Sequence, residues 1–208
     1  MKKIAAILIT LSLLILGIAG CSNVSVSTDE TTERENAVTN QNQTTNKTDA
    51  STLIVYYSYS GTTQRVAERL QALTGGTVYE LTLANPYTGD SYDVSDRVFA
   101  ERDAGEMPEL AGELPNLSEY DTILIGTPVW NDSMANPIIS YLEQTDFNGK
   151  TVSLFWTYIT NEGTTEKDFS EQAQNAQIAD GLALRSANTI SDNELNQKLQ
   201  NWLNIMAG

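Results

Sequence analysis

Short apolar runs alternate with helical segments along residues 52–208, and this alternation is the feature that most restricts the fold. Three runs, Leu53–Tyr57, Thr122–Gly126 and Thr151–Trp156, are five or six residues long and mostly apolar. Such runs are typical of strands that are buried on both faces. Because strands that alternate with helices build βαβ units, the sequence predicts an α/β fold with a mostly parallel sheet covered by helices on both sides.

The other elements follow from periodicity and from start and stop signals. Val66 and Leu70 recur at helical spacing, and Gly75-Gly76 ends the helix that they indicate. The last helix starts with the capping-box pair Ser191 and Glu194. Two further strands are expected at 77–83 and 182–187. Three further helices are expected near 93–103, at 136–142 and at 165–176.

The first twenty residues have the order of a secretory signal. Met1–Lys3 carries positive charge, Ile4–Ile18 is almost wholly apolar, and small residues precede Cys21. The apolar run is short for a spanning helix, which needs about 20 residues. Ile18-Ala19-Gly20-Cys21 resembles a bacterial lipobox, which implies cleavage before Cys21 and acylation of its thiol. An ordinary signal anchor with an incidental cysteine is the alternative.

Residues 22–51 differ in composition from the segments on either side. Of these 30 residues, 18 are Ser, Thr, Asn or Gln and none is aromatic, so this stretch cannot bury a core. We therefore expect a lipoprotein signal peptide at 1–20, a lipidated cysteine with a disordered tether at 21–51, and one folded domain at 52–208. The expected location is the extracytoplasmic face of the bacterial cell membrane, with the lipid on Cys21 as the anchor.

Composition excludes several kinds of chemistry. The chain has no histidine, so it cannot contain a Ser-His-Asp triad, a Cys-His dyad or a His-ligated metal site. Its single cysteine excludes intramolecular disulfides and thiolate clusters. A balance of 12 basic against 27 acidic residues argues against nucleic acid as a partner. Asp90, Asp93 and Asp96 favour a solvated acidic helix face over a Ca²⁺ site, and no metal site is expected.

Three loops that come after strands carry unusual residues. The first loop, Ser58–Thr63, offers four Ser/Thr hydroxyls and one glycine at the start of a helix, where backbone N–H groups can bind an anion. A Ser/Thr-rich turn that only caps the helix is the alternative. The second loop, Gly126–Ser133, contains Trp130, which either offers a flat surface to a ring or covers loop residues. The third loop, Thr157–Thr164, contains Tyr158, a second aromatic face.

These loops together resemble those of flavodoxins, and more closely those of flavodoxin-like proteins with a long segment after the second strand. Ser58–Thr63 is similar to their flavin-phosphate loop, and Gly126–Trp130 is similar to their G-x-P-x-W loop. Pro86-Tyr87, Asp96-Arg97, Asp103–Gly105 and Pro108–Leu110 also match that pattern. The resemblance implies a three-layer sandwich with a five-stranded parallel sheet in the order 2-1-3-4-5.

The resemblance also implies FMN as cofactor. The residues expected to bind it are Ser58, Tyr59, Ser60, Gly61, Thr62, Thr63, Pro128, Val129, Trp130, Asn131, Thr157 and Tyr158, with no side chain in a catalytic role. The sequence departs from the family pattern at Asn131-Asp132, where the family usually has a second Trp and a Gly, and in the third loop, which is usually rich in Gly and Ser. Both departures concern the flavin ring and not the phosphate.

Three functional hypotheses are consistent with these residues. The first is an FMN-binding redox protein, membrane-anchored and extracytoplasmic, that carries electrons between partner proteins or to a small acceptor. The second is an FMN-dependent NAD(P)H:quinone-type oxidoreductase. The third is a flavodoxin-like binding protein that has lost FMN. The domain carries 8 basic and 22 acidic residues, and this field should lower a flavin potential and favour basic partners.

Overall fold

The computed structural model describes residues 51–208. The expected signal peptide, Cys21 and the tether up to residue 50 lie outside these residues. Within the described part, no helix is long and apolar enough to cross a membrane.

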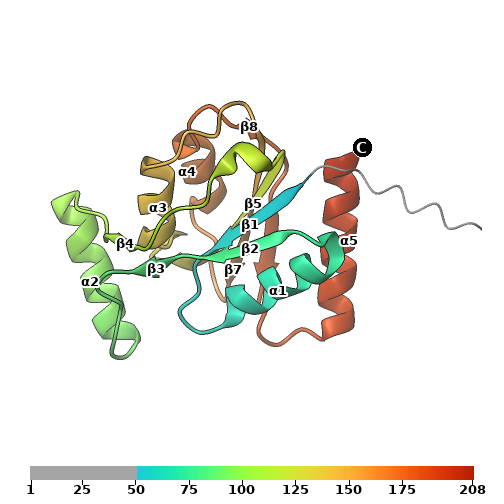
Figure 1. Ribbon diagram of the computed structural model, residues 1–208. Helices are drawn as coiled ribbons and strands as arrows, with labels where there is room; N and C mark the ends of the chain where they lie inside the picture. Colours follow the sequence, from blue (N-terminus) through green and yellow to red (C-terminus); the bar gives the residue numbers. More distant parts are fainter. Residues whose placement is uncertain (1–50) are drawn as a thin grey trace, which may run out of the picture. The chain divides into compact units, whose positions relative to one another are not determined.

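The central sheet is parallel, and its five main strands lie in the spatial order β2-β1-β5-β7-β9 (Figure 1). Counted along the chain as parallel strands, this is the order 2-1-3-4-5, so the predicted fold class is confirmed. Their bounds are Thr52–Tyr56 for β1, Thr77–Glu80 for β2, Thr122–Trp130 for β5, Thr151–Tyr158 for β7 and Leu182–Arg185 for β9.

Four short strands add to this frame. β8 (Gln177–Ile178) pairs with the start of β7, and β6 (Ser133–Met134) folds back antiparallel on β5. β3 (Thr82–Leu83) and β4 (Leu110–Ala111) form a separate antiparallel pair beside the sheet.

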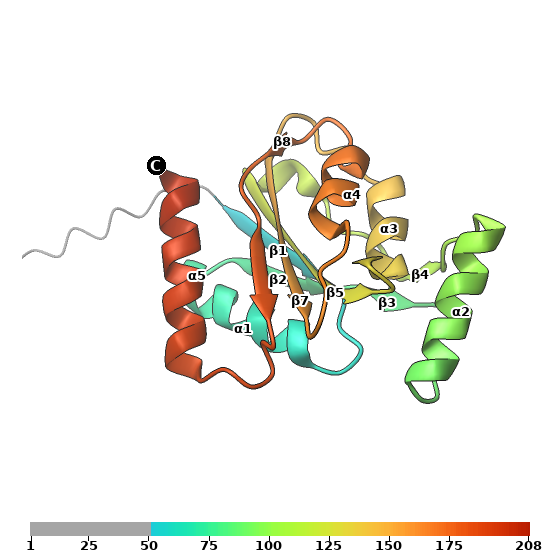
Figure 2. The ribbon, with the colours of Figure 1, turned by 180° about the vertical axis from the view of Figure 1, so that it is seen from behind.

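Helices cover both faces of the sheet (Figures 1 and 2). α1 (Thr62–Thr74) and α5 (Asp192–Ala207) lie on one face, and α3 (Asn136–Glu143) and α4 (Thr165–Gln172) lie on the other. α2 (Ser91–Ala104) stands beyond the β3–β4 pair at the outer side of the molecule. A 3₁₀ turn, η1 (Leu117–Glu119), precedes β5.

Alternate residues of the strands enter two separate cores. Leu53 and Val55 of β1 belong to the core beneath α3 and α4, whereas Ile54 and Tyr56 belong to the core beneath α1 and α5. All four side chains are buried. Burial on both faces explains why β1 is a continuous apolar run and lacks a two-residue alternation.

Several expected boundaries were wrong. The expected strand at 77–83 is broken into β2 and β3, because the Leu81 N–H makes a last hydrogen bond to β1, at the Tyr56 carbonyl, and Thr82–Leu83 then pair with β4. The helix expected at 165–176 ends at Gln172, and the strand expected at 182–187 ends at Arg185. The Ser191 side chain accepts the Glu194 N–H, which is one half of the expected capping box.

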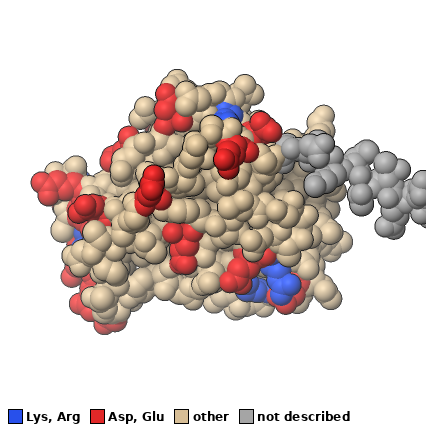
Figure 3. Space-filling model, in the orientation of Figure 1, with Lys and Arg blue, Asp and Glu red and all other residues tan. Residues whose placement is uncertain are grey.

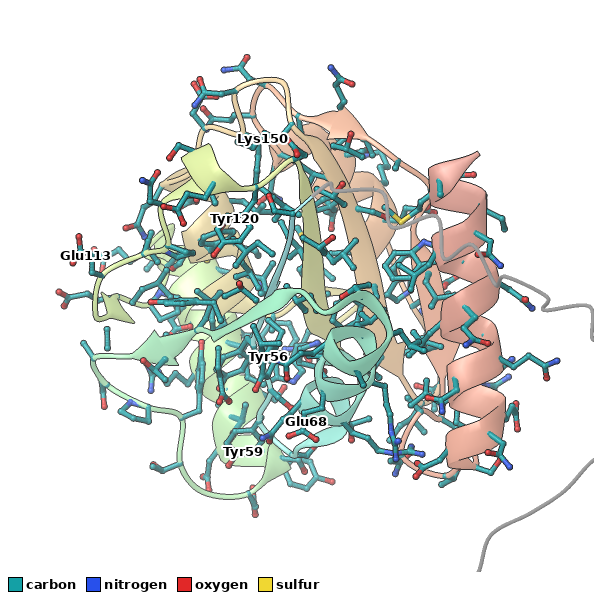
Figure 4. All side chains as sticks on the ribbon, turned by 45° about the vertical axis from the view of Figure 1, so that its right-hand side comes forward. Tyr56, Tyr59, Glu68, Glu113, Tyr120 and Lys150 are labelled. Atoms are coloured by element: carbon teal, nitrogen blue, oxygen red, sulfur yellow. The ribbon has the colours of Figure 1, made fainter. Side chains whose placement is uncertain are left out.

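The chain enters the sheet and forms its first loop at opposite edges. Ser51 lies at the amino edge, where its carbonyl accepts the Asp121 N–H at 3.0 Å. The loop after β1 lies at the carboxyl edge, which is the edge where ligands of open parallel sheets bind. Figure 4 labels Tyr56 and Tyr59 at the carboxyl edge and Tyr120 and Lys150 at the amino edge.

Candidate functional site

The first loop leaves the start of α1 uncapped. Gly61 precedes the helix with φ of 82°, and no side chain of residues 51–208 accepts the N–H groups of the first turn. A Cβ at Gly61 would meet no atom within 4 Å, so its backbone conformation, and not crowding, favours glycine there. Ser60 and Thr62 contact each other through their hydroxyls at 3.2 Å, which leaves the helix-capping alternative unrealised. An uncapped N-terminus of this kind suits an anion.

Two buried hydroxyls of the first loop differ in their partners. Thr63 Oγ1 shares a hydrogen bond of 2.9 Å with Thr157 Oγ1, which ties the loop to the end of β7. Ser58 Oγ has less than 1 Å² of accessible surface and no hydrogen-bond partner within residues 51–208. A buried hydroxyl without a partner costs about 1–3 kcal/mol, so Ser58 Oγ is suited to a ligand atom.

The second loop is the tip of a β-hairpin. β5 continues to Trp130 and turns into β6 through Asn131 and Asp132, whose φ values of 48° and 62° are both positive, as a type I′ turn requires. Asn and Asp tolerate this region better than other residues with a side chain. The residues that depart from the family pattern therefore still form a tight turn.

The third loop is bonded directly to the second. The Asp132 carbonyl accepts the Thr164 N–H at 2.8 Å, and Asn161 Nδ2 donates to Asp132 Oδ1 at 2.9 Å. Gly163 has φ of 59°, and a Cβ there would lie 1.9 Å from the Asp132 carbonyl oxygen. Only glycine permits this approach, so Gly163 joins the two loops into one unit.

Aromatic rings surround Trp130 edge-on. Its ring centroid lies 5.5 Å from that of Tyr57, 6.1 Å from that of Tyr59 and 5.1 Å from that of Tyr87, with interplanar angles between 78° and 89°. These T-shaped contacts fix the orientation of the indole. Burial raises the pKa of Tyr57 to about 12.

A cavity of about 420 Å³ opens between the first loop, the second loop and α2, a volume within the range of small-molecule sites, roughly 300–1,000 Å³. Its walls are formed by Tyr59, Ser60, Ser91, Val94, Ser95, Val98, Val129, Trp130 and Asn131.

Five of the twelve residues predicted to bind the cofactor line this cavity, namely Tyr59, Ser60, Val129, Trp130 and Asn131. Gly61, Thr62 and Thr63 lie at the start of α1, and Ser58 lies just after β1. Pro128 and Thr157 are register partners on β5 and β7. Tyr158 is half-buried against the core, and the cavity does not include it.

Sequence reasoning missed Arg102, which supports the second loop from the last turn of α2. Its guanidinium donates to the carbonyls of Trp130, Asn131 and Met134 at 3.1, 3.1 and 2.9 Å and to Asn136 Oδ1 at 2.8 Å. Burial lowers the pKa of Arg102 from its ordinary value. No sequence signal identifies this role, because only the fold brings the end of α2 to the hairpin.

A second network joins α2 to the wall of the site. Glu101 accepts from Arg97 Nε at 2.7 Å, from Asn136 Nδ2 at 2.8 Å and from the Tyr87 hydroxyl. The Arg97 guanidinium also lies 4.1 Å from the centre of the Tyr87 ring. Burial, and then the hydrogen bond to Glu101, raise the pKa of Tyr87 above its ordinary value. The long segment after β2 therefore positions the ring that packs on Trp130.

The acidic cluster at the start of α2 has a structural role. The Asp90 side chain caps the helix by accepting hydrogen bonds from the N–H groups of Tyr92 and Asp93. The Asp93 side chain in turn accepts a hydrogen bond from the Asp90 N–H. This reciprocal pair is a capping box, which explains two of the three carboxylates. Within residues 51–208, no group of His, Cys, Asp or Glu side chains is arranged to hold a metal ion.

Fold and site define a doubly wound α/β protein with an uncapped, hydroxyl-rich loop at the start of α1 and an aromatic-walled cavity at the carboxyl edge of the sheet. The model of the flavodoxin family matches residues 51–206, and the chain belongs to that family.

Solved structures of flavoproteins are similar to this chain over nearly their whole length. A protein described as a flavoprotein from Bacteroides eggerthii is 27% identical with a TM-score of 0.66, and 76% of this chain matches 99% of it. Another from Bacteroides uniformis is 31% identical with a TM-score of 0.64, over 73% of this chain and 98% of that one. A flavoprotein from Lactobacillus acidophilus in complex with FMN is 26% identical with a TM-score of 0.62, over 74% of this chain and 99% of that one.

Proposed function

We propose that this chain is an FMN-binding flavodoxin-like redox protein, held at the extracytoplasmic face of the membrane by a lipid on Cys21, that carries electrons between partners. The observation that carries the FMN proposal is the uncapped start of α1 beside the unpartnered Ser58 hydroxyl. The FMN complex of the Lactobacillus acidophilus relative supports the choice of flavin.

The first loop suits the phosphate of FMN. Backbone N–H groups at a helix start and Ser/Thr hydroxyls donate hydrogen bonds to phosphate oxygens without a positive side chain. Ser58, Ser60, Thr62 and Thr63 supply the hydroxyls, and Gly61 keeps the backbone free of a side chain at the helix start.

The aromatic wall of the cavity suits a flat heterocycle. The flavin would supply the electron chemistry, and the protein would bind it, orient it and tune its potential. Trp130 is fixed by three aromatic neighbours, and Arg102 holds the Trp130 and Asn131 carbonyls, so this wall is already in place before a ligand binds. Preorganisation of this kind reduces the entropy that binding has to overcome.

The charge of the domain favours a low-potential carrier. Residues 52–208 have 8 basic and 22 acidic side chains, and Figure 3 shows separate groups of red residues scattered over the visible face, with few blue ones. Because the reduced flavin is an anion, a negative field disfavours reduction and lowers the potential. The lipid anchor on Cys21 rests on the resemblance of residues 18–21 to a lipobox.

The visible spectrum of the purified domain tests the flavin proposal. Residues 51–208, prepared without the first fifty residues, should be yellow or should bind added FMN with one site per chain. Relatives that match this part over 98–99% of their own length fold without a longer chain, so the domain is expected to fold alone. A colourless, folded product that takes up no FMN would refute our proposal. It would support the hypothesis of a flavodoxin-like binding protein that has lost FMN.

The cavity beside Trp130 favours one second candidate, an FMN-dependent NAD(P)H:quinone-type oxidoreductase. Its apolar residues, including Val94, Val98 and Val129, would contact a small aromatic acceptor that lies against the bound flavin ring. Hydride transfer to a flavin needs no acid or base side chain, which agrees with the lack of histidine. Steady-state oxidation of NAD(P)H with added quinones separates the two: turnover supports the enzyme, and its absence with flavin bound supports the carrier.

A further inference from the structure

The outward face of α2 carries two exposed aromatic rings in one line. We call Tyr92, Asp96, Phe99 and Asp103 the α2 stripe. At 100° per residue these four side chains fall within an arc of about 60°, and they extend roughly 16 Å along the helix axis. Val94 and Val98, the buried residues of α2, lie on the opposite side of the helix.

These rings are unusually exposed for their size. Tyr92 is 80% exposed and Phe99 is 51% exposed. A helix that covers a core normally places polar residues outward, whereas α2 has apolar residues on both faces. One exposed aromatic residue needs no explanation, but two on one face beside a ligand cavity mark an interaction surface. In Figures 1 and 2 no other element within residues 51–208 covers the side of α2 that faces away from the sheet.

The charge on the stripe has one sign because both arginines of α2 are held inward. Arg97 binds Glu101 and the carbonyls of Asn85 and Pro86, and Arg102 binds the hairpin. Asp96 and Asp103 are exposed between and beside the rings. In Figure 3 red residues gather at the left end of the molecule, where Figure 1 places α2.

The stripe and the cavity lie on different sides of the same helix. Ser91, Val94, Ser95 and Val98 on the inner side of the same helix line the cavity next to Trp130. The thickness of one helix, about 10–12 Å with its side chains, therefore separates a partner on the stripe from the cavity.

We propose that the α2 stripe is the docking surface for a protein with a basic face, which contacts Tyr92 and Phe99 through apolar groups and Asp96 and Asp103 through Lys or Arg. Aromatic anchors surrounded by charges of one sign are typical of interfaces that use electrostatic steering. A second copy of this chain would bring another acidic domain against the stripe, and anionic lipids would be repelled. That this partner exchanges electrons rests on the proposed function; that it docks does not.

A backbone NMR titration tests the surface without requiring a flavin. Isotope-labelled residues 51–208 are titrated with cytochrome c as a basic probe protein, at about 10 mM and about 150 mM salt, between which screening shortens from roughly 30 Å to 8 Å. Amide shifts should concentrate in residues 91–104 and shrink at the higher salt. Shifts that leave α2 unaffected would overturn the proposal.

Paired variants assign the binding to the stripe. Asp96→Asn with Asp103→Asn should weaken the affinity by about three- to tenfold, and Tyr92→Ala with Phe99→Ala by about tenfold or more. The matched control, Glu143→Gln with Glu166→Gln, removes two exposed carboxylates from α3 and α4 and should change the affinity by less than about twofold.

Equal losses in the control and in the stripe variants would overturn the proposal, because they would show a response to net charge alone. Sedimentation that showed a dimer abolished by Tyr92→Ala with Phe99→Ala, or vesicle binding lost in the same variant, would assign the stripe to another occupant. A chain that docks cytochrome c on α2 but binds no FMN would refute the proposed function alone. A chain that binds FMN but docks the probe elsewhere would refute the docking surface alone.

Discussion

Replacement of Ser58 by alanine should change stability and FMN affinity in opposite directions. Without flavin, Ser58 Oγ is buried and has no partner within residues 51–208, a state that costs about 1–3 kcal/mol. Ser58→Ala removes that cost, so the flavin-free domain should gain about 1 kcal/mol in unfolding free energy. For a domain of this size the gain corresponds to roughly 2–4 °C in Tm.

With FMN present, the same hydroxyl would donate to a charged phosphate oxygen. A hydrogen bond to a charged group contributes about 1.5–3 kcal/mol, so Ser58→Ala should raise the Kd for FMN by about 10- to 150-fold. Urea denaturation of the flavin-free protein and flavin fluorescence titration measure the two effects. Ser118→Ala, in an exposed turn at the opposite edge of the sheet, is the control and should change neither. A Ser58→Ala domain that is less stable without flavin, or that binds FMN as tightly as the parent, would refute this reasoning.

Three further substitutions test the support of the site and of the fold. Arg102→Met removes four hydrogen bonds and should lower the unfolding free energy by about 2–4 kcal/mol; a urea midpoint equal to the parent's would contradict this. Gly163→Ala adds a left-handed penalty of about 1–2 kcal/mol and a clash with the Asp132 carbonyl, so Tm should fall by at least about 4 °C in a calorimetric scan. The hydrogen bond from Arg65 lowers the pKa of Asp192 in the folded protein below its ordinary value of 3.8. The carboxylate therefore stabilises the fold at pH values above 3.8, and this stabilisation is lost as the pH falls through the pKa of the folded protein. The Tm deficit of Asp192→Asn should therefore be present at neutral pH and shrink in acid, and a deficit independent of pH would exclude the charge as its cause.

The sheet was predictable because its signal is local. Each buried strand is a continuous apolar run, and such runs result from burial on both faces, as for Ile54 and Val55 in the two cores. The predicted strand at 77–83 was wrong for a reason that the periodicity of its residues does not contain. Its alternation continues through Leu81, but after the Leu81 bond to Tyr56 the main chain leaves β1 and pairs with β4.

The site was predictable only in part. Hydroxyls and a glycine directly after a strand identify the first loop, since their position in the chain is enough to place them at a helix start. No comparable sequence signal identifies Arg102 or Gly163. Their roles depend on distances between segments that are far apart in sequence, from the end of α2 to the hairpin and from the third loop to Asp132. Tyr158 carried an aromatic signal but packs against the core.

The second and third loops form one unit, and this bears on whether the departures from the family pattern have removed the flavin site. Asn131 and Asp132 keep the positive φ values of a tight turn, and the glycine that the second loop lacks stands opposite, at Gly163, where it lets the loops meet. The backbone path is therefore kept while the polar rim changes. Asp132 is held by Asn161, and Glu162 accepts from Trp156 Nε1 at 3.1 Å, so two carboxylates are fixed on the second and third loops. Under the proposed function, fixed negative charge there would disfavour an anionic reduced flavin without blocking the oxidised one. On that proposal, the departures are expected to lower the flavin potential and not to remove the flavin site.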